Sequence, residues 1–225
     1  MNDESPEAEL ASSEERRFRQ ARKERHIVLI VFLSIPLIFC ILGYGCWRWK
    51  YPYGYRCCVS SLIHLDFATY AGDHDGWYPK GGATPLESLQ KLCFEAAGCR
   101  HLAGFSGSEK KTVERLSSGG TLDETISSWV YYPGLREDDE DLLSAQGIKP
   151  KLGLALVWER RSGIGMGGVR APEGSHLVIF SRESPTQIGA TEWDSFLKEQ
   201  EECRRVIFAS RAQPSIMNTP PPRTN

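Results

Sequence analysis

The residues that could do chemistry are densest at residues 70–79, which read YAGDHDGWYP. Carboxylates and imidazole bind metals, and Asp-x-Asp-Gly is typical of the start of a calcium loop. Such a loop needs a bidentate Glu at its twelfth position, and counted from Asp73 that position is Thr84. We therefore interpret the stretch as a structural corner that closes a helix and wedges the chain against the core. The residues of this structural motif are Asp73, Asp75, Gly76, Trp77, Tyr78 and Pro79.

A second candidate site is the acidic run at residues 137–141. Hard cations such as calcium bind several carboxylates on a flexible loop. A run of like charges is more often a solvated loop, so calcium is a secondary expectation and we expect no other cofactor. The candidate metal ligands are Glu137, Asp138, Asp139 and Asp141.

Motifs of enzyme active sites do not appear in a supporting context. GIGMGG at residues 163–168 matches G-x-G-x-x-G by letter, but a nucleotide-binding loop must follow a strand directly and open a helix, and Pro172 follows this one. G-x-S-x-G and H-E-x-x-H are absent. We expect the chain not to be an enzyme, and its net charge of -2 argues against a nucleic-acid partner.

Residues 27–47 contain no charged residue and predict a transmembrane helix. A helix of this length rises about 31 Å, enough to cross a hydrocarbon core. Pro36 is tolerated with a kink. Basic residues are more numerous before the segment than after it, so we expect a cytoplasmic N-terminus and an extracytoplasmic C-terminal part, in the inner (plasma) membrane. A cleaved signal peptide and a lipoprotein cut before Cys46 remain alternatives.

The flanking segments complete the organisation. We expect a cytoplasmic tail at 1–26, disordered up to about residue 15, a linker at 48–56, a folded domain at 57–208 and a Pro-rich disordered tail at 209–225. Helices are predicted at 57–72, at 84–98 with Thr84 as cap, and at 190–208 with Thr191 as cap. Strands are predicted near 128–132, 151–159 and 175–181, and one helical turn near 110–116. The fold class is therefore α+β with a small antiparallel sheet.

The cysteines after the anchor are odd in number, so at least one is free or pairs between chains. Cys93 and Cys99 are close enough in sequence for a local disulfide. The helix at 57–72 carries an apolar stripe that we expect to pack on the sheet. That stripe is Val59, Leu62, Ile63, Phe67 and Tyr70, and its expected partners are Leu154, Leu156, Trp158, Val178 and Phe180.

Residues 57–79, CCVSSLIHLDFATYAGDHDGWYP, resemble the opening of bacterial pilin-like proteins related to type II secretion pseudopilins. WVYYPGL at 129–135 is similar to a later strand of that family, and the resemblance continues to about residue 202. It implies a pilin-like domain, with one helix packed on an antiparallel sheet, on an anchor that lacks the standard prepilin leader.

The resemblance and the anchor together predict a non-enzymatic, single-pass membrane protein. We expect it to have an interaction or scaffold role in a bacterial secretion or envelope system, with the lipid bilayer and other envelope or secretion proteins as its partners. One alternative is an extracytoplasmic ligand- or calcium-binding sensor that uses the acidic run or the Gly-rich connection. The other is a membrane-bound hydrolase with an unfamiliar site.

Overall fold

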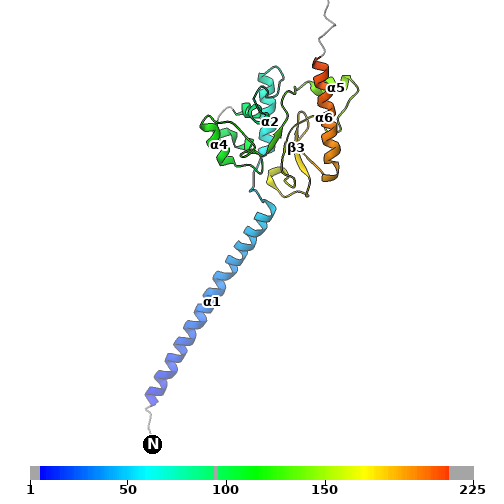
Figure 1. Ribbon diagram of the computed structural model, residues 1–225. Helices are drawn as coiled ribbons and strands as arrows, with labels where there is room; N and C mark the ends of the chain where they lie inside the picture. The colour runs from blue at the N-terminus through cyan, green and yellow to red at the C-terminus, as the bar shows by residue number, and fades with distance from the viewer. Residues whose placement is uncertain (1–5, 94–95, 213–225) are drawn as a thin grey trace, which may run out of the picture. The chain divides into compact units, whose positions relative to one another are not determined.

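The computed structural model describes residues 6–93 and 96–212, and the chain divides into two compact units, Met1–Lys50 and Tyr51–Asn225 (Figure 1). We call the second unit the C-terminal domain. Each unit has its own architecture.

The first unit is a helix, α1 (Pro6–Lys50), with Pro36 in its interior. Within it, Val28–Lys50 is long and apolar enough to cross a membrane, and none of this segment is buried. Two sequence-based boundaries need correction. The predicted disordered tail is helical from residue 6, and residues 48–50 continue the helix instead of starting the linker.

The C-terminal domain is built on a four-stranded antiparallel sheet in the order β1-β2-β3-β4. The three predicted strands are β1 (Trp129–Tyr131), β2 (Ala155–Glu159) and β3 (His176–Phe180), and β2 pairs with β3 as expected. The sequence analysis missed β4 (Thr186–Ile188), which pairs with β3 at the sheet edge. The coarse fold class, helices with an antiparallel sheet after an apolar N-terminal helix, is confirmed.

Helices cover the two faces of the sheet. Figure 1 shows β3 between α2 (Val59–Asp73) and α6 (Ala190–Ala212). The remaining helices lie in the connections. They are α3 (Pro85–Leu89), α4 (Glu109–Ser117), α5 (Asp139–Ala145) and the 3-10 segments Gln90–Leu92, Ala96–Ala103 and Met166–Gly168.

Two apolar clusters form the core, one on each face. Ile63 and Phe67 of α2 share the larger cluster with Leu154, Leu156 and Ile179, among others. The smaller cluster joins α6 to the opposite face, and its buried residues are Ala155, Trp158, Val178, Phe180, Ile188 and Phe196.

The expected packing of α2 is therefore partly wrong. Successive strand residues point to opposite faces, so Trp158, Val178 and Phe180 contact the α6 side and not α2. Leu62 also leaves the predicted stripe, because 45% of it is exposed.

Helix ends differ from the prediction where local contacts decide them. The predicted Thr84 cap is confirmed, since Glu87 N donates to Thr84 Oγ1 at 3.1 Å. That helix stops at Leu89 instead of residue 98, and a 3-10 turn follows it. Cys93 then has an extended backbone conformation and forms the expected disulfide with Cys99.

Three further boundaries are corrected. The acidic run, expected as a loop, contributes the first turn of α5. Thr191 is not a cap, because α6 already begins at Ala190, and α6 continues to Ala212, beyond the predicted domain end at 208. Of the predicted Pro-rich tail, residues 213–225 lie outside the described residues.

Candidate functional site: a basic and aromatic surface

The DHDG part of the structural motif ends α2. His74 N and Gly76 N both donate to the carbonyl oxygen of Ala71, at 3.1 and 2.9 Å. Asp75 and Gly76 have φ values of 53° and 76°, the left-handed conformation in which many helices terminate. The carboxylates of Asp73 and Asp75 are on exposed residues of this turn.

The WYP part joins this turn to the segment after β1. Tyr78 is buried, its N donates to Leu135 O at 3.1 Å, and its ring meets Phe67 edge-on at 5.8 Å. Pro79 O accepts a 2.6 Å hydrogen bond from the hydroxyl of Tyr131 in β1. Burial, and secondarily the acidic groups around it, raise the pKa of Tyr78 far above its ordinary value. The motif thus fixes α2 to the sheet through both backbone and side-chain contacts.

Trp77 is half-buried and does not enter the core with its neighbour, and three cations lie close to its indole ring. Lys80 Nζ lies 2.9 Å from a ring centroid, and the guanidinium carbons of Arg211 and Arg136 lie at 4.7 and 5.2 Å. Cations over an indole face are attracted by its quadrupole. Slight desolvation lowers the pKa of exposed Lys80, and the nearby charges of Arg211 and Arg136 lower it further.

Arg211, in the last turn of α6, holds this arrangement together. Its guanidinium donates to Gly134 O at 2.6 Å and to the buried carboxylate of Asp139. Asp139 also accepts from Arg136 N at 2.6 Å. Burial raises the pKa of Asp139 despite these contacts. The guanidinium of Arg211 and the backbone N–H of Arg136 therefore offset only part of the free-energy cost of burying this charged carboxylate.

Two exposed aromatic side chains continue the surface along α6. Tyr132 is 43% exposed and Phe208 is 44% exposed. The guanidinium carbon of buried Arg204 lies 4.1 Å from the Tyr132 ring, and Tyr132 stacks on Trp158 at 5.1 Å. Burial lowers the pKa of Arg204 to about 10. Phe208 lies beside Gly134, where an added Cβ would meet the phenyl ring at 3.5 Å.

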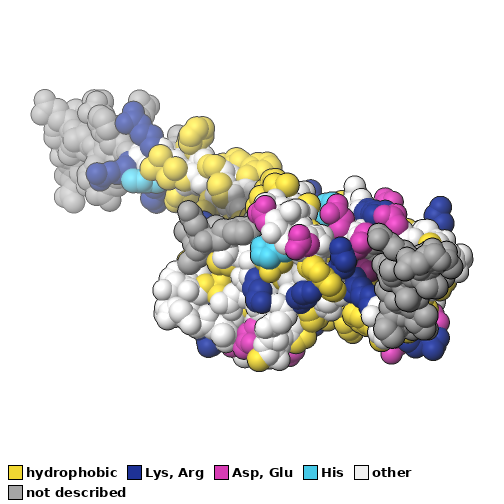
Figure 2. Space-filling view, turned by 90° about the horizontal axis from the view of Figure 1, so that it is seen from above, with side chains coloured by type: hydrophobic (Ala, Val, Ile, Leu, Met, Phe, Trp, Pro, Cys, Tyr) yellow, Lys and Arg dark blue, Asp and Glu magenta, His cyan; other side chains and the backbone are white. Residues whose placement is uncertain are grey.

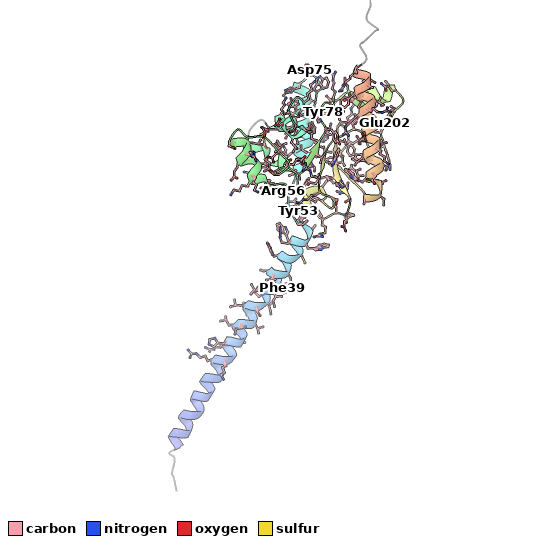
Figure 3. All side chains as sticks on the ribbon, in the orientation of Figure 1. Phe39, Tyr53, Arg56, Asp75, Tyr78 and Glu202 are labelled. Carbon is pink, nitrogen blue, oxygen red and sulfur yellow. A yellow bond between two sulfur atoms is a disulfide. The ribbon has the colours of Figure 1, made fainter. Side chains whose placement is uncertain are left out.

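We call this set the α6 surface. Its members are Trp77, Lys80, Tyr132, Arg136, Phe208 and Arg211. Figure 3 labels Asp75 and Tyr78 near this end of the C-terminal domain, and Figure 2 looks onto the same end, where basic and hydrophobic side chains lie next to one another. Trp, Tyr, Phe and Arg are the residues enriched in protein–protein interfaces. The arrangement suits contact with another protein.

The predicted calcium ligands do not converge. Asp138 pairs with Arg136 at 3.2 Å, Asp139 pairs with Arg211, and Asp141 pairs with Arg182 at 2.6 Å. Within residues 6–93 and 96–212, no three His, Cys, Asp or Glu side chains gather as metal ligands would. Calcium binding at Glu137 and its neighbours stays a prediction that this arrangement does not favour.

The Gly-rich connection at 163–168 forms no nucleotide-binding turn, since it contains only a short 3-10 segment, Met166–Gly168, and continues into extended Val169 instead of a helix. It does border a cavity of about 500 Å³. The residues lining that cavity are Pro52, Tyr53, Ser162, Gly163, Arg170, Ala171 and Glu173.

The sequence analysis anticipated Trp77 as a wedge but missed the partners of its ring. A signal existed: Arg204, Phe208 and Arg211 recur at helical spacing, but the predicted helix stopped at residue 208. No family model, curated protein or solved structure matches this chain. The case for a function therefore depends on the motifs and on this geometry.

Proposed function

We propose that the chain is a single-pass, membrane-anchored protein that binds another protein through the α6 surface and catalyses no reaction. The observation that carries the proposal is the ring of Trp77 with three cations close to it, one of which, Arg211, also binds the carbonyl of Gly134, next to the exposed ring of Phe208.

Several contacts hold these side chains in place before any partner arrives. Arg204 lies under Tyr132, and Arg211 is tied to Gly134 and to Asp139. A surface already ordered in the free protein loses less side-chain entropy on binding. Exposed aromatic rings beside arginines, ordered in this way, are typical of residues that dominate binding energy.

The proposal includes orientation and family. The excess of basic residues before the apolar segment supports a cytoplasmic N-terminus. The motif at residues 70–79 and the packing of α2 on an antiparallel sheet support a pilin-like domain. The partner is then another protein of a bacterial secretion system or envelope.

Site-specific photocrosslinking tests the binding surface. A photoreactive residue at 208 should crosslink to one partner in membranes, whereas the same residue at Leu65, which is 61% exposed on α2, should not. Substituting Lys80→Glu should weaken the crosslink from position 208 at least tenfold, because it reverses a charge beside Trp77. Equal crosslinking from both positions would contradict the proposal.

A ligand-sensing function is the second candidate, because the 500 Å³ cavity lies at the predicted Gly-rich connection. Arg170 and Glu173 line it and could hold a small polar ligand. A metabolite screen by thermal shift, with Glu173→Ala as control, tests this function. A ligand that raises the melting temperature of both proteins equally would not be bound at this cavity.

A further inference from the structure

The adjacent residues Cys57 and Cys58 form the second chemically distinctive site of the C-terminal domain, away from the α6 surface. Their sulfur atoms lie 2.9 Å apart. Even non-bonded carbon atoms rest at about 3.5–4.0 Å, and a disulfide bond is about 2.05 Å long. The two sulfur atoms are therefore closer to each other than non-bonded atoms normally come, but farther apart than in a disulfide bond.

The backbone creates this contact. Cys58 has φ 66° and ψ 2°, a left-handed conformation that is unfavourable for a non-glycine residue. Its carbonyl accepts the first hydrogen bond of α2, from Leu62 N at 2.8 Å. The turn is thus fixed by the helix that follows it, and strain of this kind concentrates at functional sites.

The surroundings favour a thiolate on Cys57. Hydrogen bonds with Cys58 and with the hydroxyl of Tyr55 lower the pKa of Cys57, while the bond with Cys57 raises the pKa of Cys58. Both residues are exposed. The start of α2 adds partial positive charge beside them, and the first turn of that helix has no acidic residue.

The other cysteines of the C-terminal domain lack these properties. Cys93 and Cys99 are already joined. Cys203 is buried, and desolvation raises the pKa of its thiol. An accessible thiol with a lowered pKa next to a second thiol has the features of a redox-active cysteine.

We propose that Cys57 and Cys58 are a redox-active dithiol that exchanges with disulfide substrates and closes to a vicinal disulfide. The thiolate of Cys57 attacks one sulfur of a disulfide R–S–S–R, forms a mixed disulfide and releases RS⁻. The thiol of Cys58 then loses its proton and attacks the sulfur of Cys57, releasing the second RS⁻. The protons of the two cysteines are taken up by the two leaving thiolates, so the dithiol is oxidised and the substrate is reduced to two thiols.

Glutathione redox buffers test the proposal on the full chain in detergent. After equilibration, acid quenching and alkylation, cleavage at Arg56 and Lys80 gives a peptide of residues 57–80 that contains no other cysteine. We expect only two forms of this peptide. The reduced form carries two alkyl groups, and the oxidised form carries none and is lighter than the free dithiol by two hydrogens. Because strained, exposed disulfides are easier to reduce, Cys93–Cys99 should stay oxidised in buffers that reduce this pair.

Matched variants separate the steps. Cys58→Ser should accumulate a glutathione adduct on Cys57, and Cys203→Ser should leave the transition unchanged. The wild-type measurement alone can overturn the proposal. A singly alkylated or glutathione-bound peptide as the main oxidised form, or a disulfide to another chain, would show that the pair does not close.

Discussion

Glu159 at the end of β2 offers the sharpest test of the C-terminal domain. Glu159 is fully buried, and three of the hydrogen bonds that its carboxylate accepts are short. The donors are Ser106 Oγ at 2.6 Å, Ser128 Oγ at 2.7 Å and Phe105 N at 2.8 Å. The side chain of Glu159 therefore fixes the loop after the 3-10 segment Ala96–Ala103 to the residue that precedes β1.

Glu159→Ala removes the acceptor: buried Phe105 N and half-buried Ser106 Oγ lose their bonds to it, and Ser128 Oγ keeps only the carbonyl of Ala103 as an acceptor. Each loss costs about 1–3 kcal/mol, and because the losses are not independent we expect a total of about 3–5 kcal/mol in the free energy of unfolding. Glu159→Gln keeps an oxygen for Ser128 and Phe105 and can donate to Ser106, so we expect a loss of about 1 kcal/mol.

Urea unfolding of the full chain in detergent, followed by tryptophan fluorescence, measures both variants. Glu173→Ala, on an exposed residue, is the control and should stay within about 0.5 kcal/mol of wild type. If Glu159→Ala unfolded like that control, the three hydrogen bonds would not be stabilising the domain.

The pH dependence of the same measurement gives an independent check. Burial raises the pKa of Glu159, although hydrogen bonds from Ser106 and Ser128 and from the backbone of Phe105 and Arg161 oppose the shift. The folded state therefore binds the proton more tightly than the unfolded state. The stabilising contribution is complete below the unfolded pKa, near 4.3, and is lost as pH rises through the folded pKa. Glu159→Gln should lack this slope, and an unchanged slope would assign it to other groups.

Three further predictions concern the core and the loops. Ile63→Asp should destabilise the domain by about 4 kcal/mol or more, because it buries a charge without a partner. Leu62→Asp should cost less than about 1 kcal/mol, because Leu62 is half exposed. Equal melting curves of the two variants by circular dichroism would refute the packing of α2. Removing the Cys93–Cys99 disulfide by double substitution with Ala should cost about 2 kcal/mol in urea, since the loop it closes is short. Gly107→Ala should lower the melting temperature by several degrees, because the added Cβ would lie 1.9 Å from the backbone oxygen of Ala103. An unchanged melting temperature would mean that the loop containing Gly107 shifts without cost.

The sequence predicted those helices and strands that depend on the spacing of apolar residues or on a capping residue within the element itself. The apolar spacing of α2, the Thr84 cap and the strands β1 to β3 were all readable. The strand β4 was missed because only one of its three residues, Ile188, is apolar, whereas β1 is equally short but consists of aromatic and β-branched residues. The start of α5 was misjudged as loop, although acidic residues in a first turn favour a helix.

Contacts between distant segments were beyond the sequence. Alternation along β2 divides its residues between two faces, but it does not reveal that a second helix covers the other face. For the same reason Trp158 was assigned to α2 although it packs toward α6. The cations around Trp77 come from three separate segments, and their meeting depends on how α6 lies against the residues after β1.

The α6 surface combines folding and binding roles in different residues, and this decides which variants are informative. Arg211 contacts Trp77 but also neutralises buried Asp139, so its removal leaves an uncompensated carboxylate and destabilises the domain. Lys80 and Phe208 are exposed, and neither supports a buried charge. Loss of binding in Lys80 or Phe208 variants with an unchanged melting temperature therefore reports on the surface itself, whereas loss in an Arg211 variant would report first on the fold.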